Sequence, residues 1–148
     1  MLQRLIKKGR VLKCLDLSHN PLGTKATDKI FESLIGSRLE ELDLSSVGMT
    51  SVGGIPVQNA SDIGRDTELR RLVLDCNAVS VQSYYHLATL ICMSKGLETL
   101  RLRACNLEDF CAILICERMI GLNRLREMDL SKNKLGDAAL ESGFATLL

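Results

Sequence analysis

The chain has 148 residues, 46% of them hydrophobic, and this length and composition suit one folded domain rather than a disordered segment. Its 19 basic and 18 acidic residues leave a formal charge of +1, which argues against a chain-wide basic surface for nucleic acid. Aromatic residues make up 3% and tryptophan is absent, which argues against base stacking and against ring-lined ligand pockets.

The first segment, residues 1–11, is too short and too interrupted by charge for a signal peptide. Leu2, Leu5 and Ile6 have helical spacing, and Gly9 would end such a helix. The longest apolar run, FCAILIC at 110–116, is far shorter than the roughly 20 residues that span a bilayer. We therefore expect a short N-terminal helix and no association with a membrane.

Five segments that follow share one pattern, with apolar residues at positions 1, 4, 6 and 11. They start near residues 12, 39, 69, 97 and 125, a period of 27 to 30 residues. The segments read LKCLDLSHNPL (12–22), LEELDLSSVGM (39–49), LRRLVLDCNAV (69–79), LETLRLRACNL (97–107) and LREMDLSKNKL (125–135). Self-similarity at such a period indicates a repeat architecture, and we number the repeats one to five.

Positions 4 and 6 of each repeat are two residues apart, so they share one face of a short strand. One repeat cannot bury its own leucines, and stacking on its neighbours is what covers them. Stacked strands lie about 4.8 Å apart, which predicts a parallel five-stranded sheet. The two inward columns are Leu15, Leu42, Leu72, Leu100 and Met128 for position 4, and Leu17, Leu44, Leu74, Leu102 and Leu130 for position 6.

The pattern resembles the leucine-rich repeat consensus LxxLxLxx(N/C)xL. The period is similar to that of the ribonuclease-inhibitor-like subclass, in which each strand is followed by a full helix. This resemblance covers residues 12–148. It implies an α/β leucine-rich repeat solenoid, a right-handed horseshoe arc with the parallel sheet on the concave face and the helices on the convex face.

Position 9 lies where the chain turns out of each strand, and a polar side chain there can pair with backbone groups that the turn leaves free. The resemblance implies a ladder of Asn or Cys side chains through these turns. Asn20, Asn77, Cys105 and Asn133 match it. Val47 has no polar side-chain atom, so we expect an altered turn in repeat two.

Helical spacing follows the first and third strands. Thr24 or Thr27 is predicted to cap the first helix and Gly36 to end it, with Ser80 and Gly96 in these roles for the third. The residues predicted to face inward are Ala26, Ile30, Phe31 and Leu34 in the first helix, and Tyr84, Leu87, Leu90 and Ile91 in the third. Of the adjacent pair at 84 and 85, one tyrosine is expected to be buried and the other exposed.

The fourth and fifth repeats predict helices over Glu108–Ile120 and Asp137–Leu148. Repeat two is different, because residues 47–68 have no apolar period of 3.6 and contain Gly48, Gly53, Gly54, Pro56 and Gly64. We expect an irregular loop there with at most one helical turn. It is either a relaxed part of the convex surface or a functional insertion.

Neither end of the chain looks like the polar cap that a solenoid needs for solubility. Residues 144–148 end on apolar side chains, and residues 1–11 resemble the helical tail of a preceding repeat. We expect residues 1–148 to form a single leucine-rich repeat domain cut from a longer array. Exposed terminal repeats would permit end-to-end self-association.

Positions 3, 5 and 7 point away from the inward leucines and predict a charged concave face. Its candidate partner-binding residues are Asp16, Glu41, Asp43, Arg71, Asp75, Arg101, Arg103, Glu127 and Asp129. Pairs such as Asp43 with Arg71, or Asp75 with Arg103, would lie on neighbouring strands. Two interpretations remain open, a self-neutralising ladder worth under about 1 kcal/mol per pair, or a groove for an acidic or mixed peptide.

Catalytic and metal-binding patterns are sparse. The six cysteines form no CxxC pair, and without a secretory signal they are expected to be reduced in the cytosol or nucleus. His19 and His86 have no nucleophile beside them by sequence spacing, apart from Cys14 near His19, which we interpret as coincidence. No phosphate-binding glycine loop or HExxH motif occurs. We expect no intrinsic catalysis and no cofactor.

Proteins with similar repeats divide by function. Ribonuclease inhibitors and innate immune receptors bind proteins on the concave face, whereas Ran GTPase-activating proteins assist a partner enzyme. Turns NPLG at 20–23 and LSSV at 44–47 are similar to those of tonsoku-like nuclear scaffold proteins. The resemblance therefore implies a protein- or peptide-binding module, with an enzyme regulator or a nuclear scaffold for chromatin and DNA repair as alternatives. Nucleic-acid binding through Arg71, Arg101 and Arg103 is a weaker alternative.

Overall fold

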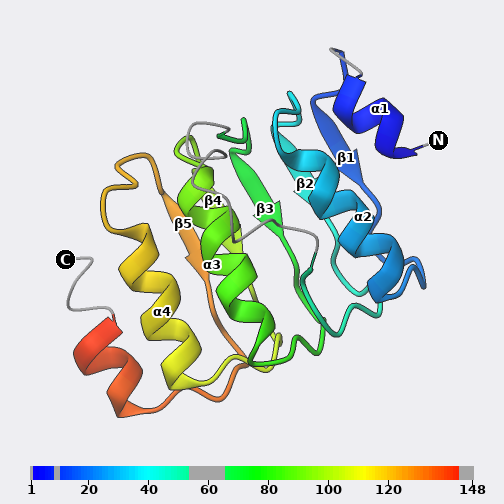
Figure 1. Ribbon diagram of the computed structural model, residues 1–148. Helices are drawn as coiled ribbons and strands as arrows, with labels where there is room; N and C mark the ends of the chain where they lie inside the picture. Colours follow the sequence, from blue (N-terminus) through cyan, green and yellow to red (C-terminus); the bar gives the residue numbers. More distant parts are fainter. Residues whose placement is uncertain (1, 9–10, 54–65, 144–148) are drawn as a thin grey trace.

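The computed structural model describes residues 2–8, 11–53 and 66–143 (Figure 1). Its elements are α1 (Leu2–Lys8), β1 (Cys14–Asp16), α2 (Thr24–Leu34), β2 (Glu41–Asp43), β3 (Arg71–Val73), α3 (Ser83–Met93), β4 (Thr99–Arg101), α4 (Asp109–Met119), β5 (Glu127–Asp129) and the π-helical turn η2 (Ala139–Gly143). The strands form one parallel sheet in the order β1-β2-β3-β4-β5. The predicted fold, an α/β leucine-rich repeat solenoid, is confirmed.

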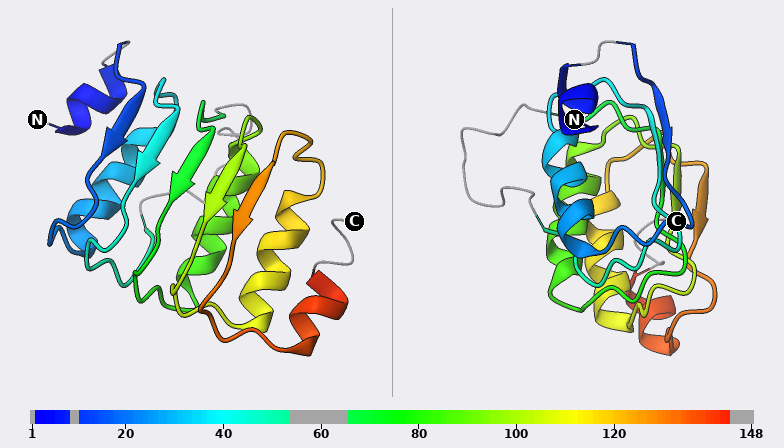
Figure 2. Two further views of the ribbon diagram at one scale, coloured as in Figure 1. Left: turned by 180° about the vertical axis from the view of Figure 1, so that it is seen from behind. Right: turned by 90° about the vertical axis from the view of Figure 1, so that its right-hand side faces the viewer.

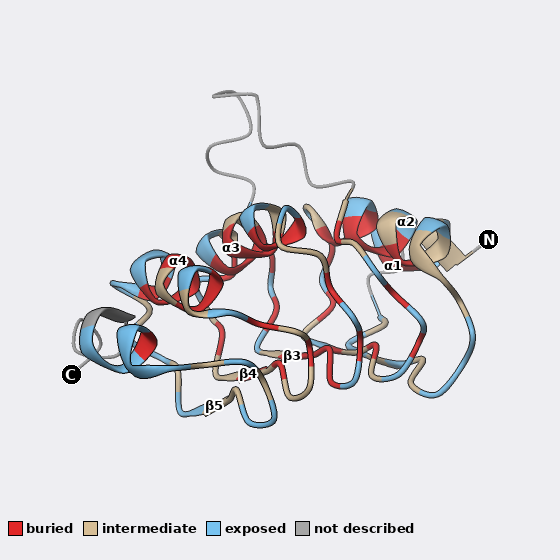
Figure 3. Ribbon diagram, turned by 90° about the horizontal axis from the view of Figure 1, so that it is seen from below, coloured by how far each residue is buried: buried red, intermediate tan, exposed pale blue. Residues whose placement is uncertain are grey.

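The molecule has two layers, with the strands side by side in one and the helices in the other (Figure 2). Helix α1 packs on α2, and α3 packs on α4, which in turn contacts η2. Buried residues line the space between the two layers, while the outer surfaces of the helices are largely exposed (Figure 3). The apolar core therefore lies between the sheet and the helices, and the other side of the sheet is left open.

The register of the sheet aligns identical repeat positions. Leu15, Leu42, Leu72, Leu100 and Met128 are successive Cα partners across the five strands. The three inner leucines of this row are fully buried, whereas Leu15 and Met128 are partly buried. A fully buried leucine contributes about 1.5–3 kcal/mol, so the two predicted columns provide a large share of the folding free energy.

A left-handed residue follows the strand in every repeat. Position 8 has a φ between 53° and 58° at His19, Ser46, Cys76, Ala104 and Lys132. The turns differ at position 10, because Gly48 of repeat two and Asn106 of repeat four also have positive φ values, 71° and 59°, whereas Pro21, Ala78 and Lys134 do not. The expected alteration of the turn in repeat two is present at the residue after Val47, and repeat four shares it. Asn77 of the next repeat holds this turn by accepting the Val47 N–H on Oδ1 at 3.2 Å.

The predicted ladder of position 9 side chains is present, and Asn77 and Asn133 each bond to the repeat before their own. Asn77 Nδ2 donates to the carbonyl oxygens of Leu44 and Leu74, both at 2.8 Å, and its Oδ1 also accepts the Met49 N–H. Asn133 repeats this arrangement one step further on, with Oδ1 accepting the N–H groups of residues 105 and 107 at 2.8 and 3.0 Å. One amide thus joins two neighbouring turns.

Val47 has its effect one repeat earlier. Because Val47 has no side-chain carbonyl, the Leu22 N–H donates to the main-chain oxygen of Asn20 instead, at 2.7 Å. Cys105 affects repeat three in the same way. It has no side-chain carbonyl, and the Val79 N–H donates to the main-chain oxygen of Asn77 at 2.9 Å. The Cys105 thiol still donates to the Leu74 oxygen at 3.1 Å. Local hydrogen bonds thus compensate for both departures from asparagine.

The N-terminal caps of the first two long helices differ from those predicted. Gly23, with a φ of 71°, precedes α2, and the Thr24 hydroxyl bonds instead to Thr50 of repeat two at 2.9 Å. The Thr27 hydroxyl donates to the main-chain oxygens of residues 23 and 24, so it does not cap α2. Helix α3 begins at Ser83 with Gln82 as its cap, and Ser80 lies in the turn before it. Contacts with neighbouring repeats decide these caps.

The C-terminal ends of α2 and α3 are set by residues next to each helix. Helix α2 ends at Leu34 with Ile35 as its cap, immediately before Gly36, whose φ is 71°. Helix α3 ends at Met93 rather than near Gly96, and the Ser94 N–H donates to the Ile91 oxygen.

The predicted buried faces of the helices are largely confirmed. Tyr84, Leu87, Leu90 and Ile91 of α3 are buried, as are Ile30, Phe31 and Leu34 of α2. Ala26 is half-buried, and Thr27 takes the buried place beside it. Of the tyrosine pair, Tyr84 is buried and donates to the Cys105 oxygen at 2.7 Å, while Tyr85 is 49% exposed.

The remaining predicted helices lie close to their expected bounds. Helix α4 covers all but the terminal residues of Glu108–Ile120. The fifth begins at Asp137 and becomes π-helical over Ala139–Gly143, and its predicted last part, 144–148, lies outside the described residues. The described parts of repeat two between its strand and β3 contain no helix. Residues 54–65 and Gly9, which was predicted to end α1, also lie outside the described residues.

Candidate functional site

The open side of the sheet, which we call the sheet face, consists of the side chains at positions 3, 5 and 7 of the repeats. Seven of the nine predicted binding residues lie within the strands, and Asp75 and Arg103 each follow a strand by two residues. The register places Glu41 beside Arg71, and Arg101 beside Asp129. The structure therefore brings the predicted residues onto one surface, but it pairs their charges differently from the expectation.

Arg101 forms the centre of the charged network on this face. Its Nε and Nη2 donate to Asp75 Oδ2 at 3.1 and 3.0 Å, and Asp129 and Glu127 lie 3.6 and 3.7 Å away. The hydrogen bond that Arg101 donates to Asp75, followed by the negative charge of Asp75, raises the pKa of Arg101. Three carboxylates thus neutralise this guanidinium, as the self-neutralising interpretation expects of a charged ladder.

The two predicted pairs do not form as ion pairs. Asp75 accepts the backbone N–H of Arg103 on Oδ1 at 2.9 Å, while its other oxygen binds Arg101. Asp43 Oδ1 accepts the N–H and the hydroxyl of Ser45 at 2.8 and 2.6 Å. Within the described chain no ion pair joins Asp43 to Arg71. Bonds within the turns and the longer reach of Arg101 override the predicted pairs.

An Asp-Leu-Ser sequence holds the end of the strand in three repeats. The aspartate at position 5 accepts the N–H of the serine at position 7 in the pairs Asp16–Ser18, Asp43–Ser45 and Asp129–Ser131. Hydrogen bonds from the two serines lower the pKa of Asp16 and Asp129 below the usual range. These carboxylates therefore remain charged at neutral pH, and they help to form the turns.

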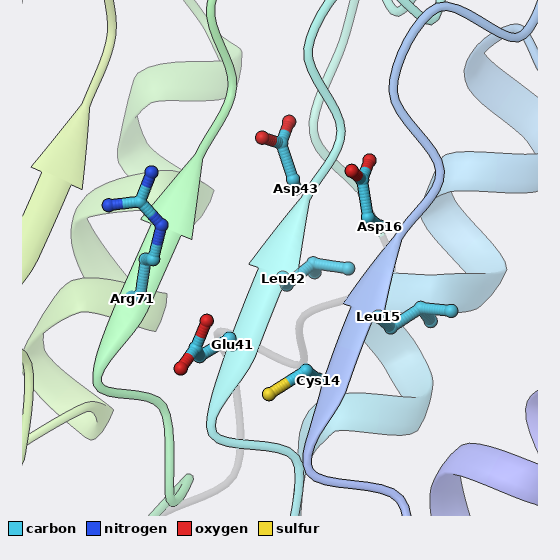
Figure 4. Close-up of a pocket in the computed structure, with 7 residues that line it drawn as sticks. All are labelled: Cys14, Leu15, Asp16, Glu41, Leu42, Asp43 and Arg71. Atoms are coloured by element: carbon cyan, nitrogen blue, oxygen red, sulfur yellow. The ribbon is translucent and has the colours of Figure 1, made fainter.

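A shallow hollow crosses β1, β2 and β3 on the sheet face (Figure 4). It is lined by the carboxylates of Asp16, Glu41 and Asp43 and by a single guanidinium, that of Arg71. The nearby Cys14 thiol has a raised pKa, because it is partly desolvated and next to the Glu41 carboxylate. A protonated thiol is a poor nucleophile, and the excess of carboxylates makes this hollow locally negative.

A second charged ladder runs along the edge of the sheet where the strands begin, at position 2. Lys13 bonds to Glu40, Arg70 lies 3.6 Å from Glu40, and Arg70 lies 3.4 Å from Glu98. The hydrogen bond between Lys13 and Glu40 raises the pKa of Lys13 and lowers the pKa of Glu40. Our sequence interpretation missed this ladder, although the alternation of charge at position 2, continuing to Arg126, is visible in the aligned repeats.

A groove lies at the opposite edge of the sheet, where the strands end. Position 8 contributes His19, Cys76 and Lys132, and position 7 contributes Asp75 and Arg103. The sequence interpretation had placed only the last two in a candidate site. The turn geometry brings the others beside them, because the left-handed residue of each repeat is stacked on the same edge.

Other chemistry is limited among the described residues. They contain no group of three or more His, Cys, Asp or Glu side chains that is arranged to hold a metal ion. All six cysteines are free thiols, and burial raises the pKa of Cys105 to about 12. In the described part of the chain, no helix has the length and apolar character needed to cross a membrane. His86 lies on α3, in the helix layer rather than on the sheet face (Figure 2).

Comparison with known proteins gives two findings. A family model described as "Leucine Rich repeat" matches residues 10–27 and 122–142. Ribonuclease inhibitor from Sus scrofa is 32% identical to this chain over 137 residues. The matched region covers 87% of this chain but 28% of the inhibitor, so the chain spans under a third of that relative. Proteins with such repeats generally mediate protein–protein interactions.

Proposed function

Since the chain is a leucine-rich repeat protein of the ribonuclease-inhibitor-like kind, we propose that its sheet face binds a partner protein and that it performs no catalysis itself. The observation that carries this proposal is the distribution of unpaired charge on the sheet face. Arg101 is neutralised by its three carboxylates, whereas Asp16, Glu41 and Asp43 form no ion pair with another described residue. These three carboxylates remain available to a partner.

The free carboxylates favour a partner that presents basic side chains over β1 and β2. Complementary charge steers association and selects partners. Arg71, beside these carboxylates, would orient the contact by pairing with an acidic side chain of the same partner. The partner surface therefore has mixed charge with basic residues predominating, rather than the acidic character that a central arginine cluster would favour.

The pig relative is named as an inhibitor of ribonuclease, a protein ligand, so a ribonuclease is the first partner to test. Binding would be measured by titration calorimetry with purified porcine ribonuclease, using the wild-type chain and the double variant Glu41→Lys/Asp43→Lys. The matched control is Glu117→Lys/Glu32→Lys, which reverses two exposed carboxylates on the helix side. We expect the sheet-face variant to bind at least tenfold more weakly and the control to bind like wild type.

If ribonuclease does not bind, the same three proteins are immobilised and incubated with cell extract. A protein that is retained by wild type and by the control, but lost from the sheet-face variant, supports the proposal. Retention of every captured protein by the sheet-face variant contradicts it, provided that circular dichroism shows all three chains to be folded.

A further inference from the structure

The groove at the edge where the strands end has a chemistry of its own. We infer that this groove binds the phosphorylated side chain of a peptide segment in the partner protein. The cations that would hold the phosphate are Arg103 and Lys132, with His19 at the far end of the groove. The inference rests on the proposed function, because the peptide belongs to a protein that docks on the chain.

The two main cations lie on neighbouring repeats. The Cys76 N–H donates to the Arg103 oxygen at 2.8 Å, and the Ala104 N–H donates to the Ser131 oxygen at 3.0 Å. These bonds place residues 103 and 132 on adjacent turns at the same edge. Neither cation forms an ion pair with any described residue, although Arg70 and Arg101 each form at least two.

The carboxylate in this groove is already occupied. Asp75 is nearly buried, with 13% of its side chain exposed, and both of its oxygens are bound within the protein. Oδ2 accepts from Arg101, and Oδ1 accepts the backbone N–H of Arg103 rather than its guanidinium. Asp75 therefore forms no ion pair with the guanidinium of Arg103 or with the ammonium of Lys132. The charge of Arg103 does affect Asp129, whose pKa is lowered by hydrogen bonds from Ser131 and, to a smaller extent, by this charge.

The floor of the groove leaves room between the cations. Position 8 has the short side chains of Ser46, Cys76 and Ala104 between His19 at one end and Lys132 at the other. A phosphate monoester carries three acceptor oxygens and nearly two negative charges at neutral pH. A guanidinium can bind it through two parallel hydrogen bonds, and an ammonium adds a third donor.

A single phosphate on a peptide fits this surface better than a nucleic acid does. No phenylalanine, tyrosine or tryptophan lines the groove, so the large rings on which bases stack are absent from its described lining. The adjoining hollow with Asp16, Glu41 and Asp43 would repel the further phosphates of a polynucleotide. The same carboxylates would attract basic residues flanking a phosphorylated serine or threonine.

The test uses a fluorescein-labelled glycine–serine peptide with two lysines and one phosphoserine, and the same peptide without the phosphate. Fluorescence anisotropy is measured with the full wild-type chain, with Arg103→Glu and Lys132→Glu, and with Lys25→Glu as a control of equal charge change on α2. We expect the phosphate to tighten binding at least tenfold. Each groove variant should lose that gain, and the control should keep it.

Three outcomes of the binding measurements would overturn the inference. They are equal binding of the two peptides, unchanged phosphate preference in both folded groove variants, or tighter binding of a ten-uridine RNA than of the phosphopeptide through the same two residues. Amide shifts in an NMR titration with the phosphopeptide provide a second readout, and changes confined to residues away from positions 7 and 8 also count against it. Loss of a partner from the Glu41→Lys/Asp43→Lys variant stands apart from all of these, so the two proposals can fail separately.

Discussion

The inner and outer strands of the sheet use the same residues to different effect. Leu72 and Leu100 are covered completely, whereas Leu15 and Met128 occupy the same position in β1 and β5 and are partly exposed. Each inner leucine has a strand on both sides, and each outer side chain has a described strand on one side. Burial in this fold is therefore a property of the neighbouring repeats rather than of the repeat itself.

The asparagines of the turns show the same contrast. Asn77 is buried and bonds to main-chain groups of its own repeat and of the repeat before it. Asn20 is exposed, and its Nδ2 donates to the oxygens of Leu17 and Ser18 in its own turn. One residue type thus joins two repeats in the centre of the sheet and supports a single turn at its edge.

The largest expected difference comes from shortening the inward leucines. Leu100→Ala should destabilise the chain by about 2–5 kcal/mol, because it leaves a cavity that neighbours on both sides cannot fill. Leu15→Ala should cost less than half as much, because water already reaches part of that side chain. Urea denaturation followed by circular dichroism measures both. Equal losses for the two variants would contradict the contrast between inner and outer strands.

A smaller difference is expected in the turns. Asn77→Ala removes the acceptor of the Val47 and Met49 N–H groups, and the cost of such unpaired buried groups is about 1–3 kcal/mol. Asn20→Ala should cost under about 1 kcal/mol, since its partners are exposed to water. Hydrogen exchange gives a specific readout, because Asn77→Ala should accelerate exchange at residues 47 and 49. Unchanged exchange at these two residues would show that the loss of stability does not come from their hydrogen bonds to Asn77.

The smallest effect concerns acid stability at the outer strands. Hydrogen bonds from Ser131 lower the folded pKa of Asp129, so the ionised carboxylate stabilises the fold above the unfolded pKa. That stabilisation is lost as the pH falls below about 4. Asp129→Asn should therefore be less stable than wild type at pH 7, and the gap should close in acid.

Melting temperatures between pH 7 and pH 2 check this prediction. Asp137→Asn, an exposed carboxylate for which the described chain provides no hydrogen bond, is the control and should follow the wild-type curve. A gap between Asp129→Asn and wild type that is constant over the whole pH range would show that the carboxylate acts by shape rather than by charge.

The sheet and its register could be predicted from the sequence, because leucines at positions 4 and 6 fix which residues face the core. The bounds of α4 and the buried side of α3 followed for the same reason. The caps at Thr24 and Ser80 could not be predicted from one repeat, since Thr24 bonds to Thr50 of the next repeat. Nor could the hydrogen bond that holds the turn at Val47, because its acceptor is Asn77, thirty residues further along the chain.

The candidate site was predictable in position and not in pairing. All nine charged residues lie on the sheet face as placed, since side chains alternate along a strand. Their pairing depends on side-chain length and on turns. Arg101 reaches Asp75 on one side and Asp129 on the other, while Asp43 is held by its own Ser45. The groove that contains Lys132 could not be predicted, because it depends on the left-handed turns at position 8. The spacing of the leucines does not indicate these turns.

The ladder at position 2 also restricts how such an array can change in length. Lysine or arginine alternates there with glutamate from Lys13 through Glu40, Arg70 and Glu98 to Arg126. Deleting one internal repeat would bring two like charges together, whereas deleting two adjacent repeats would restore the alternation. The alternation therefore predicts that the gain or loss of two adjacent repeats disturbs this edge of the sheet less than the gain or loss of one repeat.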